Sequence, residues 1–308
     1  MKLAFLFAGQ GSQKAGMGRD LYEHYPAFRA AFDSAELDFD LKRVCFEDPD
    51  GVINQTRYTQ PCMVAFAAGV AAVLAENGIA PDYAAGLSLG EYSALHAAGV
   101  FTAKQAIELV AFRGAAMERA AQGVESAMTA VLMLGREALE RCCEEASALG
   151  VVRICNYNCP GQLVIGGEKA AVDKAGELAK AAGARRLMPL RVSGPFHTPL
   201  MKPAGDALRE RFAAETFGEM KFPVLFNCLG REKNGESIAE LLERQVQSSV
   251  YMEDTIRRLM ELGVDTVVEI GPGRALSGFV QKTAGNAINC YAVEDCQSLA
   301  AALEALKA

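Results

Sequence analysis

A serine flanked by two glycines is the residue of this chain best placed to act as a nucleophile. Residues 86–90 read Gly-Leu-Ser-Leu-Gly, with Ser88 at the centre, and a helix-like run follows. A strand that ends in such a turn and continues into a helix can hold the serine in a strained conformation, beside the N–H groups of the helix N-terminus. An ordinary small-residue turn is the alternative, because this pattern also occurs by chance. The strand-like residues before the turn and the helix after it favour the nucleophile.

A serine nucleophile needs a general base, and histidine is the usual one. The chain has three histidines. His96 follows Ser88 on the same predicted helix at about 12 Å, given the helical rise, so it cannot reach the hydroxyl. His24 lies in an amphipathic stretch and is expected at the surface or in packing. His197 lies where two parts of the predicted fold meet and clefts form, so it is predicted as the base rather than as a helix cap.

The group that orients the histidine stays open on the residues alone. No acidic residue stands out between Ser88 and His197. Glu269, at the end of a predicted strand, is the best acidic candidate. A carbonyl oxygen is the alternative.

An arginine in an apolar helical stretch is the candidate for substrate binding. No carboxylate lies one helical turn from Arg113, whose neighbours at that spacing are Leu109, Val110, Ala116 and Met117. A guanidinium on an apolar face needs an anion from elsewhere, and beside an acyl-transfer serine that anion is a substrate carboxylate. A distant ion pair or a surface position is the alternative.

A second glycine-rich turn follows the first predicted strand. Residues 9–13 read Gly-Gln-Gly-Ser-Gln, and Lys14 occupies the place of the third glycine of a dinucleotide motif. A turn at a strand end can present a backbone N–H as half of an oxyanion hole. The Gly-Pro-Gly of residues 271–273 is predicted to be a structural turn.

The elements that must position these residues alternate between strand and helix, which indicates an α/β fold. Predicted strands cover residues 3–7, 83–87, 222–228 and 266–270, and predicted helices cover 60–77, 103–122, 237–247 and 252–262. Between them, residues 124–197 follow the order strand, helix, strand, strand, helix, strand, which is the ferredoxin-like pattern. We therefore expect a catalytic domain of residues 1–123 and 198–308, interrupted by a subdomain of residues 124–197.

Composition limits the class of protein. The 308 residues are 51% hydrophobic, which excludes wholesale disorder, and the net charge of −7 argues against nucleic-acid binding. No apolar run reaches the ~18 residues of a membrane span. The nine cysteines lack zinc-site spacing. We expect reduced thiols, a cytoplasmic monomer, no metal and no cofactor.

Six segments, in this order, carry a family resemblance: FAGQGSQ, GLSLGEYSAL, FRGAAM, NYNCPGQLVIGG, GPFHTPLM and EIGPGRAL. Together they resemble the malonyl-CoA:acyl carrier protein transacylases of type II fatty acid synthesis, from about residue 4 to residue 283. The resemblance implies an α/β-hydrolase-like large domain with an inserted ferredoxin-like subdomain. It also implies ping-pong transfer of malonyl from malonyl-CoA, through a malonyl-serine, to the phosphopantetheine thiol of the carrier protein.

The family's roles fall on matching positions. The resemblance makes Ser88 the nucleophile, His197 the base and Arg113 the partner of the malonyl carboxylate. It assigns the oxyanion hole to the N–H groups of Gln10 and Leu89. In addition, it gives the carbonyl of Gln245 the task of orienting the histidine.

The chain departs from the family pattern beside two of these residues. Leu87 stands where the family usually has histidine, and Ala8 stands where it usually has proline. Neither position carries an assigned chemical role. Ser248-Ser249 replaces the Asn-Pro that commonly precedes the next valine.

The residues leave three other functions open. A serine thioesterase or hydrolase would use the same turn with water as acceptor, and a stand-alone acyltransferase would serve polyketide synthesis. A non-catalytic acyl-binding module is disfavoured by the Ser88 and His197 pair. Because carrier proteins are acidic, we expect docking on a local basic patch of Lys174, Lys180, Arg185 and Arg186, with a solvated helix face as the alternative.

Overall fold

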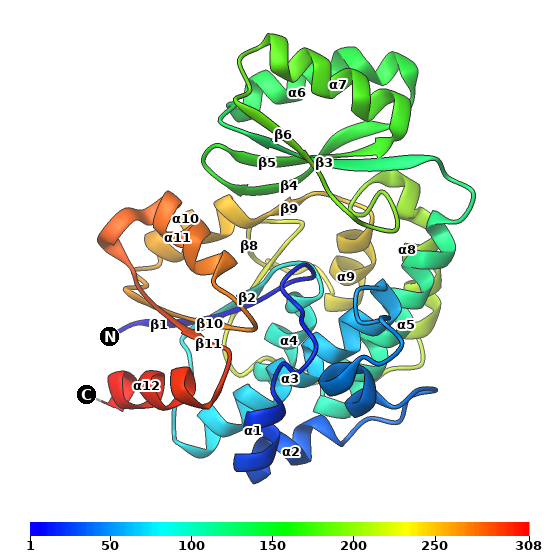
Figure 1. Ribbon diagram of the computed structural model, residues 1–308. Coiled ribbons are helices and arrows are strands. Elements are labelled where there is room, and N and C mark those ends of the chain that lie inside the picture. The colour runs from blue at the N-terminus through cyan, green and yellow to red at the C-terminus, as the bar shows by residue number, and fades with distance from the viewer. Residues whose placement is uncertain (308) are drawn as a thin grey trace.

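The computed structural model describes residues 1–307, which form a large lower body and a smaller upper one (Figure 1). The large body contains a six-stranded sheet in the order β11-β10-β1-β2-β7-β8. Its strands are β1 (Leu3–Phe7), β2 (Tyr83–Gly86), β7 (Val224–Phe226), β8 (Arg231–Glu232), β10 (Thr266–Ile270) and β11 (Asn289–Val293). All neighbours pair in parallel except β7 and β8.

The central strand β1 is apolar throughout because both faces of the sheet are covered by helices. Alternate side chains point to opposite faces. Phe5 and Phe7 therefore join the core shared with α3 (Thr56–Glu76) and α4 (Gly90–Ala97). Ala4 and Leu6 join a second core. The helices of that second core are α10 (Met252–Glu261) and α11 (Ala275–Ala284).

The remaining helices complete the large body. They are α1 (Arg19–His24), α2 (Pro26–Phe32), η1 (Arg43–Glu47), α5 (Ala103–Ala121), η3 (Pro199–Met201), α8 (Lys202–Phe212), α9 (Ile238–Val246), η4 (Gly285–Ala287) and α12 (Cys296–Lys307). Thr102 caps α5 and Ser237 caps α9, each in a reciprocal capping box.

Helix α3 begins at Thr56, four residues before its predicted start at residue 60, and contains Pro61. Its length and apolar composition would suffice for a membrane span, but 83% of the apolar window is buried inside the fold. It lies against α2 and α5 in the core. Its apolar character therefore reflects packing on several sides.

The upper body has the order predicted for residues 124–197. Its elements are β3 (Ser126–Leu132), α6 (Arg136–Ala146), η2 (Ser147–Leu149), β4 (Val152–Cys159), β5 (Gln162–Glu168), α7 (Lys169–Ala181) and β6 (Arg186–Pro189). The sheet order is β6-β3-β5-β4-β9, and these strands pair antiparallel except at β9. Helices α6 and α7 cover one face (Figure 1).

The last strand of the upper sheet comes from the later part of the chain. β9 (Val250–Tyr251) pairs in parallel with β4. The two bodies therefore share backbone hydrogen bonds as well as chain crossings. The domain boundaries at residues 123/124 and 197/198 stay a prediction.

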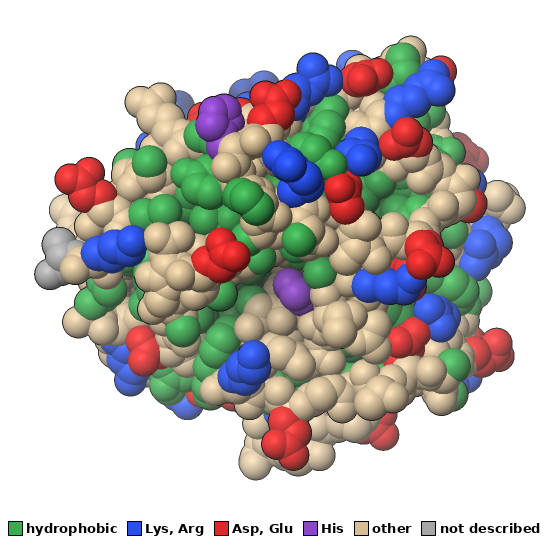
Figure 2. Space-filling view, turned by 90° about the horizontal axis from the view of Figure 1, so that it is seen from below, with side chains coloured by type: hydrophobic (Ala, Val, Ile, Leu, Met, Phe, Trp, Pro, Cys, Tyr) green, Lys and Arg blue, Asp and Glu red, His purple; other side chains and the backbone are tan. Residues whose placement is uncertain are grey.

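The surface carries charges of both signs. Figure 2 shows Lys and Arg interspersed with Asp and Glu on the face of the molecule seen from below in Figure 1. Many charged side chains of the protein are paired, as in the contact of Lys104 with Glu36 at 2.8 Å. Exposed pairs of this kind contribute little to stability.

Candidate active site

Ser88 lies on a sharp turn between β2 and α4. Its φ of 54° is in the left-handed region, which is rare for a residue with a side chain. The flanking glycines permit the turn. A β carbon on Gly86 would lie 2.0 Å from the carbonyl carbon of Gly90, and one on Gly90 would lie 2.3 Å from the oxygen of Phe7. The spacing of the two glycines is thus a steric requirement of this turn.

Ser88 and His197 meet in the structure although 109 positions separate them in the chain. The serine Oγ is 2.8 Å from Nε2 of the histidine, and Nδ1 of the same ring is 2.9 Å from the carbonyl oxygen of Gln245. A carbonyl only accepts hydrogen bonds, so Nδ1 carries the proton and Nε2 is free to accept from the serine hydroxyl.

The imidazole of His197 is held neutral by its surroundings. The residue is buried and follows Phe196 in the loop before η3. Burial, and then the positive charge of Arg113, lower the pKa of His197 to about 4. A ring with this pKa is unprotonated at neutral pH, which is the form a general base requires.

Arg113 reaches the same serine from α5. Its side chain is 0% exposed, and it donates to Ser88 Oγ at 3.1 Å, to Gln245 Oε1 at 2.9 Å and to Gln60 Oε1 at 2.7 Å. No carboxylate of residues 1–307 forms an ion pair with it. Burial lowers the pKa of the guanidinium. A distant ion pair and a surface position are therefore both wrong as alternatives for Arg113.

The backbone around the serine offers two free donors. The N–H groups of Gln10 and Leu89 donate no hydrogen bond within residues 1–307. The N–H of Ser88 itself is occupied, since it donates to Oδ1 of Asn227 at 2.7 Å. Free N–H groups beside a nucleophile can accept a developing oxyanion.

A pocket of about 120 Å³ opens on Ser88, His197 and Gln10. Its other lining residues are both polar and apolar: Gln60, Asn156, Leu87, Met117, Met128, Leu190, Val192 and Phe196. Its volume suits a short acyl group. Among residues 1–307 no group of three His, Cys, Asp or Glu side chains is arranged to hold a metal.

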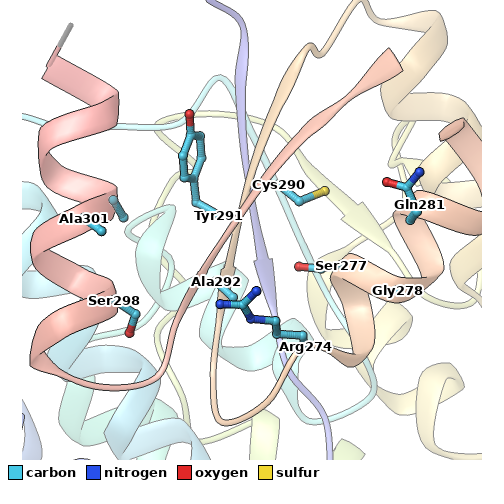
Figure 3. A pocket seen from close by; sticks show the side chains of 10 residues that line it. Arg274, Ser277, Gly278, Gln281, Cys290, Tyr291, Ala292, Ser298 and Ala301 are labelled. Carbon is cyan, nitrogen blue, oxygen red and sulfur yellow. The ribbon is translucent and has the colours of Figure 1, made fainter. Parts of the chain in front are cut away.

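Glu269 does not approach the histidine, so its prediction as the orienting acid is wrong. Its carboxylate accepts from the N–H of Leu276 at 2.9 Å, and from the N–H and the hydroxyl of Ser277 at 2.7 and 2.6 Å. It therefore caps the start of α11. Ser277 also lines a separate pocket of about 470 Å³ beside β11, together with Arg274 and Tyr291 (Figure 3).

The other two histidines also lie away from the site, as predicted. Nδ1 of His96 is 2.9 Å from the carbonyl of Phe101, and Nδ1 of His24 is 2.8 Å from the carbonyl of Asp20. Both contacts are local. Each hydrogen bond joins the histidine to a carbonyl in or just after its own helix.

Three polar residues at the site escape sequence reasoning. Gln60 on α3 accepts from Arg113, and Asn227 and Glu91 lie behind the serine turn. Little in the local sequence marks them, because Gln60 ends the polar run of residues 56–60 at the start of α3, and Glu91 is followed by Tyr92 and Ser93 in the short helix α4. A buried polar side chain in either helix needs a partner.

The comparisons with known proteins agree with this geometry. The model of the acyl transferase domain family matches residues 4–301, so the chain belongs to the acyl transferases. Malonyl CoA-acyl carrier protein transacylase of Bacillus subtilis is 42% identical, over 99% of this chain and 98% of that protein. The crystal structure of MCAT from Streptococcus pneumoniae is 47% identical with a TM-score of 0.94, covering 99% of this chain and 100% of that one.

A third relative was solved with its partner. It is a malonyl-transacylase in complex with a type II PKS acyl-carrier protein, 41% identical with a TM-score of 0.94, covering 99% of this chain and 100% of that chain. The chain belongs to the malonyl CoA-acyl carrier protein transacylase family. The predicted resemblance and the predicted fold class, a hydrolase-like domain with a ferredoxin-like subdomain, are thereby confirmed.

Proposed function

We propose that this protein transfers malonyl from malonyl-CoA to the phosphopantetheine thiol of acyl carrier protein, through a malonyl ester of Ser88. The observation that carries the proposal is the chain of contacts from Ser88 Oγ to His197 and on to the Gln245 carbonyl, with a buried arginine at the same oxygen. Family membership supports the choice of substrate and acceptor.

In the first half-reaction, His197 Nε2 takes the Ser88 proton as Oγ bonds to the thioester carbonyl carbon. The N–H groups of Gln10 and Leu89 stabilise the negative oxygen of the tetrahedral intermediate. The intermediate collapses with loss of the coenzyme A thiolate, which receives the proton from the imidazolium. The Gln245 carbonyl keeps the ring in one tautomer and orientation throughout.

The second half-reaction runs the same steps with a new nucleophile. His197 removes the proton of the carrier's phosphopantetheine thiol, and the sulfur attacks the malonyl-serine carbonyl. The ester bond to Ser88 Oγ breaks, and the imidazolium returns the proton to that oxygen. No metal or redox group takes part in either step.

Arg113 selects for malonyl in this proposal. Its guanidinium is buried, has no ion-pair partner among residues 1–307, and touches the oxygen that will carry the acyl group. A malonyl carboxylate provides the missing partner in a bidentate pair. Acetyl leaves the guanidinium unpaired in a dry site, so it is disfavoured.

Polyketide synthesis is the second candidate pathway, because the relative solved with a type II PKS acyl-carrier protein is 41% identical to this chain. Hydrolysis in place of transfer is less well supported, since the pocket is only about 120 Å³ and is lined in part by apolar side chains. Excluding water protects the acyl-serine until the thiol arrives.

We further propose a cytoplasmic monomer. All nine cysteines are unpaired, which suits a reducing compartment. The serine, histidine, arginine and glutamine of the site all come from one chain. The site therefore needs no residue from a second copy.

The test is intact-protein mass spectrometry in two steps. Mixing with malonyl-CoA should add one malonyl group that maps to Ser88. Adding holo carrier protein should then remove the group and load the carrier. Parallel reactions with a fatty acid carrier and a polyketide carrier rank the two pathways, while loss of the adduct without carrier would identify a hydrolase.

A further inference from the structure

A single asparagine side chain holds both sides of the serine turn. Oδ1 of Asn227 accepts from the N–H of Ser88 at 2.7 Å, and Nδ2 of the same amide donates to the carbonyl of Gly86 at 2.6 Å. Asn227 directly follows β7, which pairs with β2. The amide thus continues the hydrogen bonding between these strands beyond the point where the backbone ladder ends.

The asparagine is itself fixed from two directions. Its N–H donates to a carboxyl oxygen of Glu91, in the first turn of α4, and its carbonyl accepts from the N–H of Tyr251 at 2.9 Å. Asn227 is 1% exposed and Glu91 is 0% exposed. The contacts therefore join the turn, the helix that follows it and β9 of the upper sheet in one buried network.

The turn needs such support because Ser88 has a φ of 54°. A non-glycine residue stays in this region only when its surroundings hold it there. The N–H of Ser88 is also kept away from the substrate side by its bond to Asn227. That leaves the neighbouring N–H of Leu89, which donates no hydrogen bond within residues 1–307, as the donor of this turn available to an oxyanion.

We propose that Asn227, supported by Glu91, is a positioning residue that fixes the backbone conformation of the nucleophile. The inference rests on the proposed function of Ser88. It assigns Asn227 no contact with substrate. Its removal should lower kcat for acylation and leave the KM for malonyl-CoA little changed, because the carboxylate and pocket contacts remain.

The discriminating variant is Asn227→Asp. A protonated aspartic acid has one acceptor oxygen and one O–H donor, so it reproduces the amide. An ionised aspartate has only acceptors and would repel the Gly86 carbonyl. Because burial raises the pKa of a carboxyl group, the variant should recover activity as the pH falls.

The wild type provides the reference for this pH series. The pKa of His197 is lowered to about 4 and that of Glu91 is raised to about 8, so neither changes charge greatly between pH 5.5 and 7. The ionisable side chains joined to Asn227 directly or through one residue are those of Glu91, Tyr251 and the adjacent Cys228, those of Arg113 and His197 through Ser88, and that of Arg244 through Cys228. Burial raises the pKa of the Cys228 thiol to about 12, so it stays protonated throughout this range.

The experiment measures kcat and KM for malonyl-CoA separately, together with the labelling rate of Ser88 by a neutral fluorophosphonate. The first assay is compared as kcat/KM. The ratio of Asn227→Asp to wild type should rise roughly tenfold from pH 7 to pH 5.5 in both assays. Asn227→Ala should be slow at both pH values. Asn158→Asp, a change at another buried asparagine, should show a ratio that does not depend on pH.

A pH-independent ratio for Asn227→Asp, or wild-type kcat in Asn227→Ala, would overturn the inference. If Asn227→Asp fails to fold, Glu91→Ala and Glu91→Gln decide instead. Glu91→Ala should lower kcat about tenfold, and Glu91→Gln, which keeps an acceptor for the Asn227 N–H, should restore it. Wild-type kcat in Glu91→Ala would then remove the proposal.

Failure of the proposed function has a different signature. Absence of a malonyl adduct on wild-type Ser88 would refute the function, while the fluorophosphonate assay would still measure the effect of Asn227. An adduct on wild type together with a flat pH ratio for Asn227→Asp would refute only the role of Asn227.

Discussion

Strands β2 and β10 of the large sheet end in similar turns, but the two turns have different roles. β2 runs into the turn of Ser88, and β10 runs into the turn of residues 271–273. Both turns contain glycines, both precede a helix, and both have a buried glutamate: Glu91 after β2 and Glu269 on β10.

The two glutamates differ in how well their oxygens are satisfied. Glu269 accepts from three donors at the start of α11. Glu91 accepts one N–H, from Asn227, and its Oε1 has no partner among residues 1–307. Burial raises the pKa of both, and raises that of Glu91 to about 8.

This difference distinguishes a strand end that supports the fold from a strand end that carries the candidate site. A buried polar group with a full set of partners supports the fold, and the β10 end is of this kind. The β2 end keeps groups unsatisfied: Oε1 of Glu91, Nε of Arg113 and the N–H of Leu89. Unsatisfied groups cost stability, and the N–H of Leu89, next to Ser88, is one that a substrate oxygen can complete, whereas Glu91 lies behind the turn.

The largest effect should come from the two serines. Ser88→Ala should abolish the malonyl adduct, because it removes the nucleophile. Ser277→Ala at the β10 end should keep the adduct and lose only a capping contact. Mass spectrometry after mixing with malonyl-CoA measures both. An adduct in Ser88→Ala would contradict the assignment of the β2 end as the site.

The histidines should differ nearly as much. His197→Ala should slow acylation by roughly three decades or more, since loss of the general base leaves only binding and the oxyanion hole. His96→Ala should change the rate little, because the imidazole of His96 forms its hydrogen bond with the Phe101 carbonyl and not with Ser88. Stopped-flow acylation with folding checked by circular dichroism compares them. Equal losses in two folded variants would be inconsistent with His197 as the only base.

The arginines test the selection of substrate. Arg113→Ala should lose roughly two to three decades of kcat/KM for malonyl-CoA and little for acetyl-CoA, because truncating one partner of a buried charge pair costs about 2–5 kcal/mol. Arg113→Lys should recover part of the loss. Arg274→Ala, at the β10 end, should affect neither thioester. An equal drop for both thioesters in Arg113→Ala would show that the arginine does not read the carboxylate.

Substitutions of the two glutamates should differ in their effect on the free energy of unfolding and on its dependence on pH. Glu269→Gln should cost about 1–3 kcal/mol, because the amide turns a donor toward the N–H groups it must accept from. Glu91→Gln should cost less at pH 6.5, where Glu91 is protonated in the folded state.

The sign of the pH effect follows from the raised pKa of Glu91. Between its ordinary value and about 8 the folded state holds a proton that the unfolded state releases, so stability falls as the pH rises. His197, with its lowered pKa, acts in the opposite direction only below about pH 6.5. The free energy of unfolding, measured with urea at a series of pH values from 6.5 to 8, should therefore fall less steeply with pH in Glu91→Gln than in the wild type. An unchanged slope would mean that Glu91 is already ionised.

The smallest effect should come from the basic patch on the upper body. Lys180, Arg185 and Arg186 are exposed, whereas Lys174 is half-buried and lies 3.7 Å from Glu177. Reversing the three exposed charges should raise the KM for carrier protein about three- to tenfold and leave that for malonyl-CoA unchanged. Lys307→Glu, on α12, is the matched control. An unchanged carrier KM would leave the patch as a solvated helix face.

Much of the fold follows from local sequence patterns. Strand β1 lies where the apolar run predicts it, the capping box of Thr102 starts α5, and the order of elements in residues 124–197 is the predicted one. These patterns predict the structure correctly because each depends on contacts within a few residues. β9 and β11 were not predicted, since a two-residue strand and an edge strand have little apolar pattern.

Some residues of the candidate site can likewise be predicted from the sequence, and others cannot. Ser88 is marked by its glycines, His197 by elimination among three histidines, and Arg113 by the absence of a local acid. The prediction of Glu269 as the orienting acid is wrong because a carboxylate that caps a helix cannot be distinguished in sequence from one that orients a histidine. Only the position of its partners distinguishes them.

The sequence by itself determined which side chains can do the chemistry, because reactive groups are a matter of residue type and local geometry. Only the tertiary structure decided what holds them. The carbonyl that orients His197 comes from a residue 48 positions away, and the amide that holds Ser88 comes from one 139 positions away. Every residue has a carbonyl, and most asparagines hold no turn, so such contacts exist only where the chain brings them together.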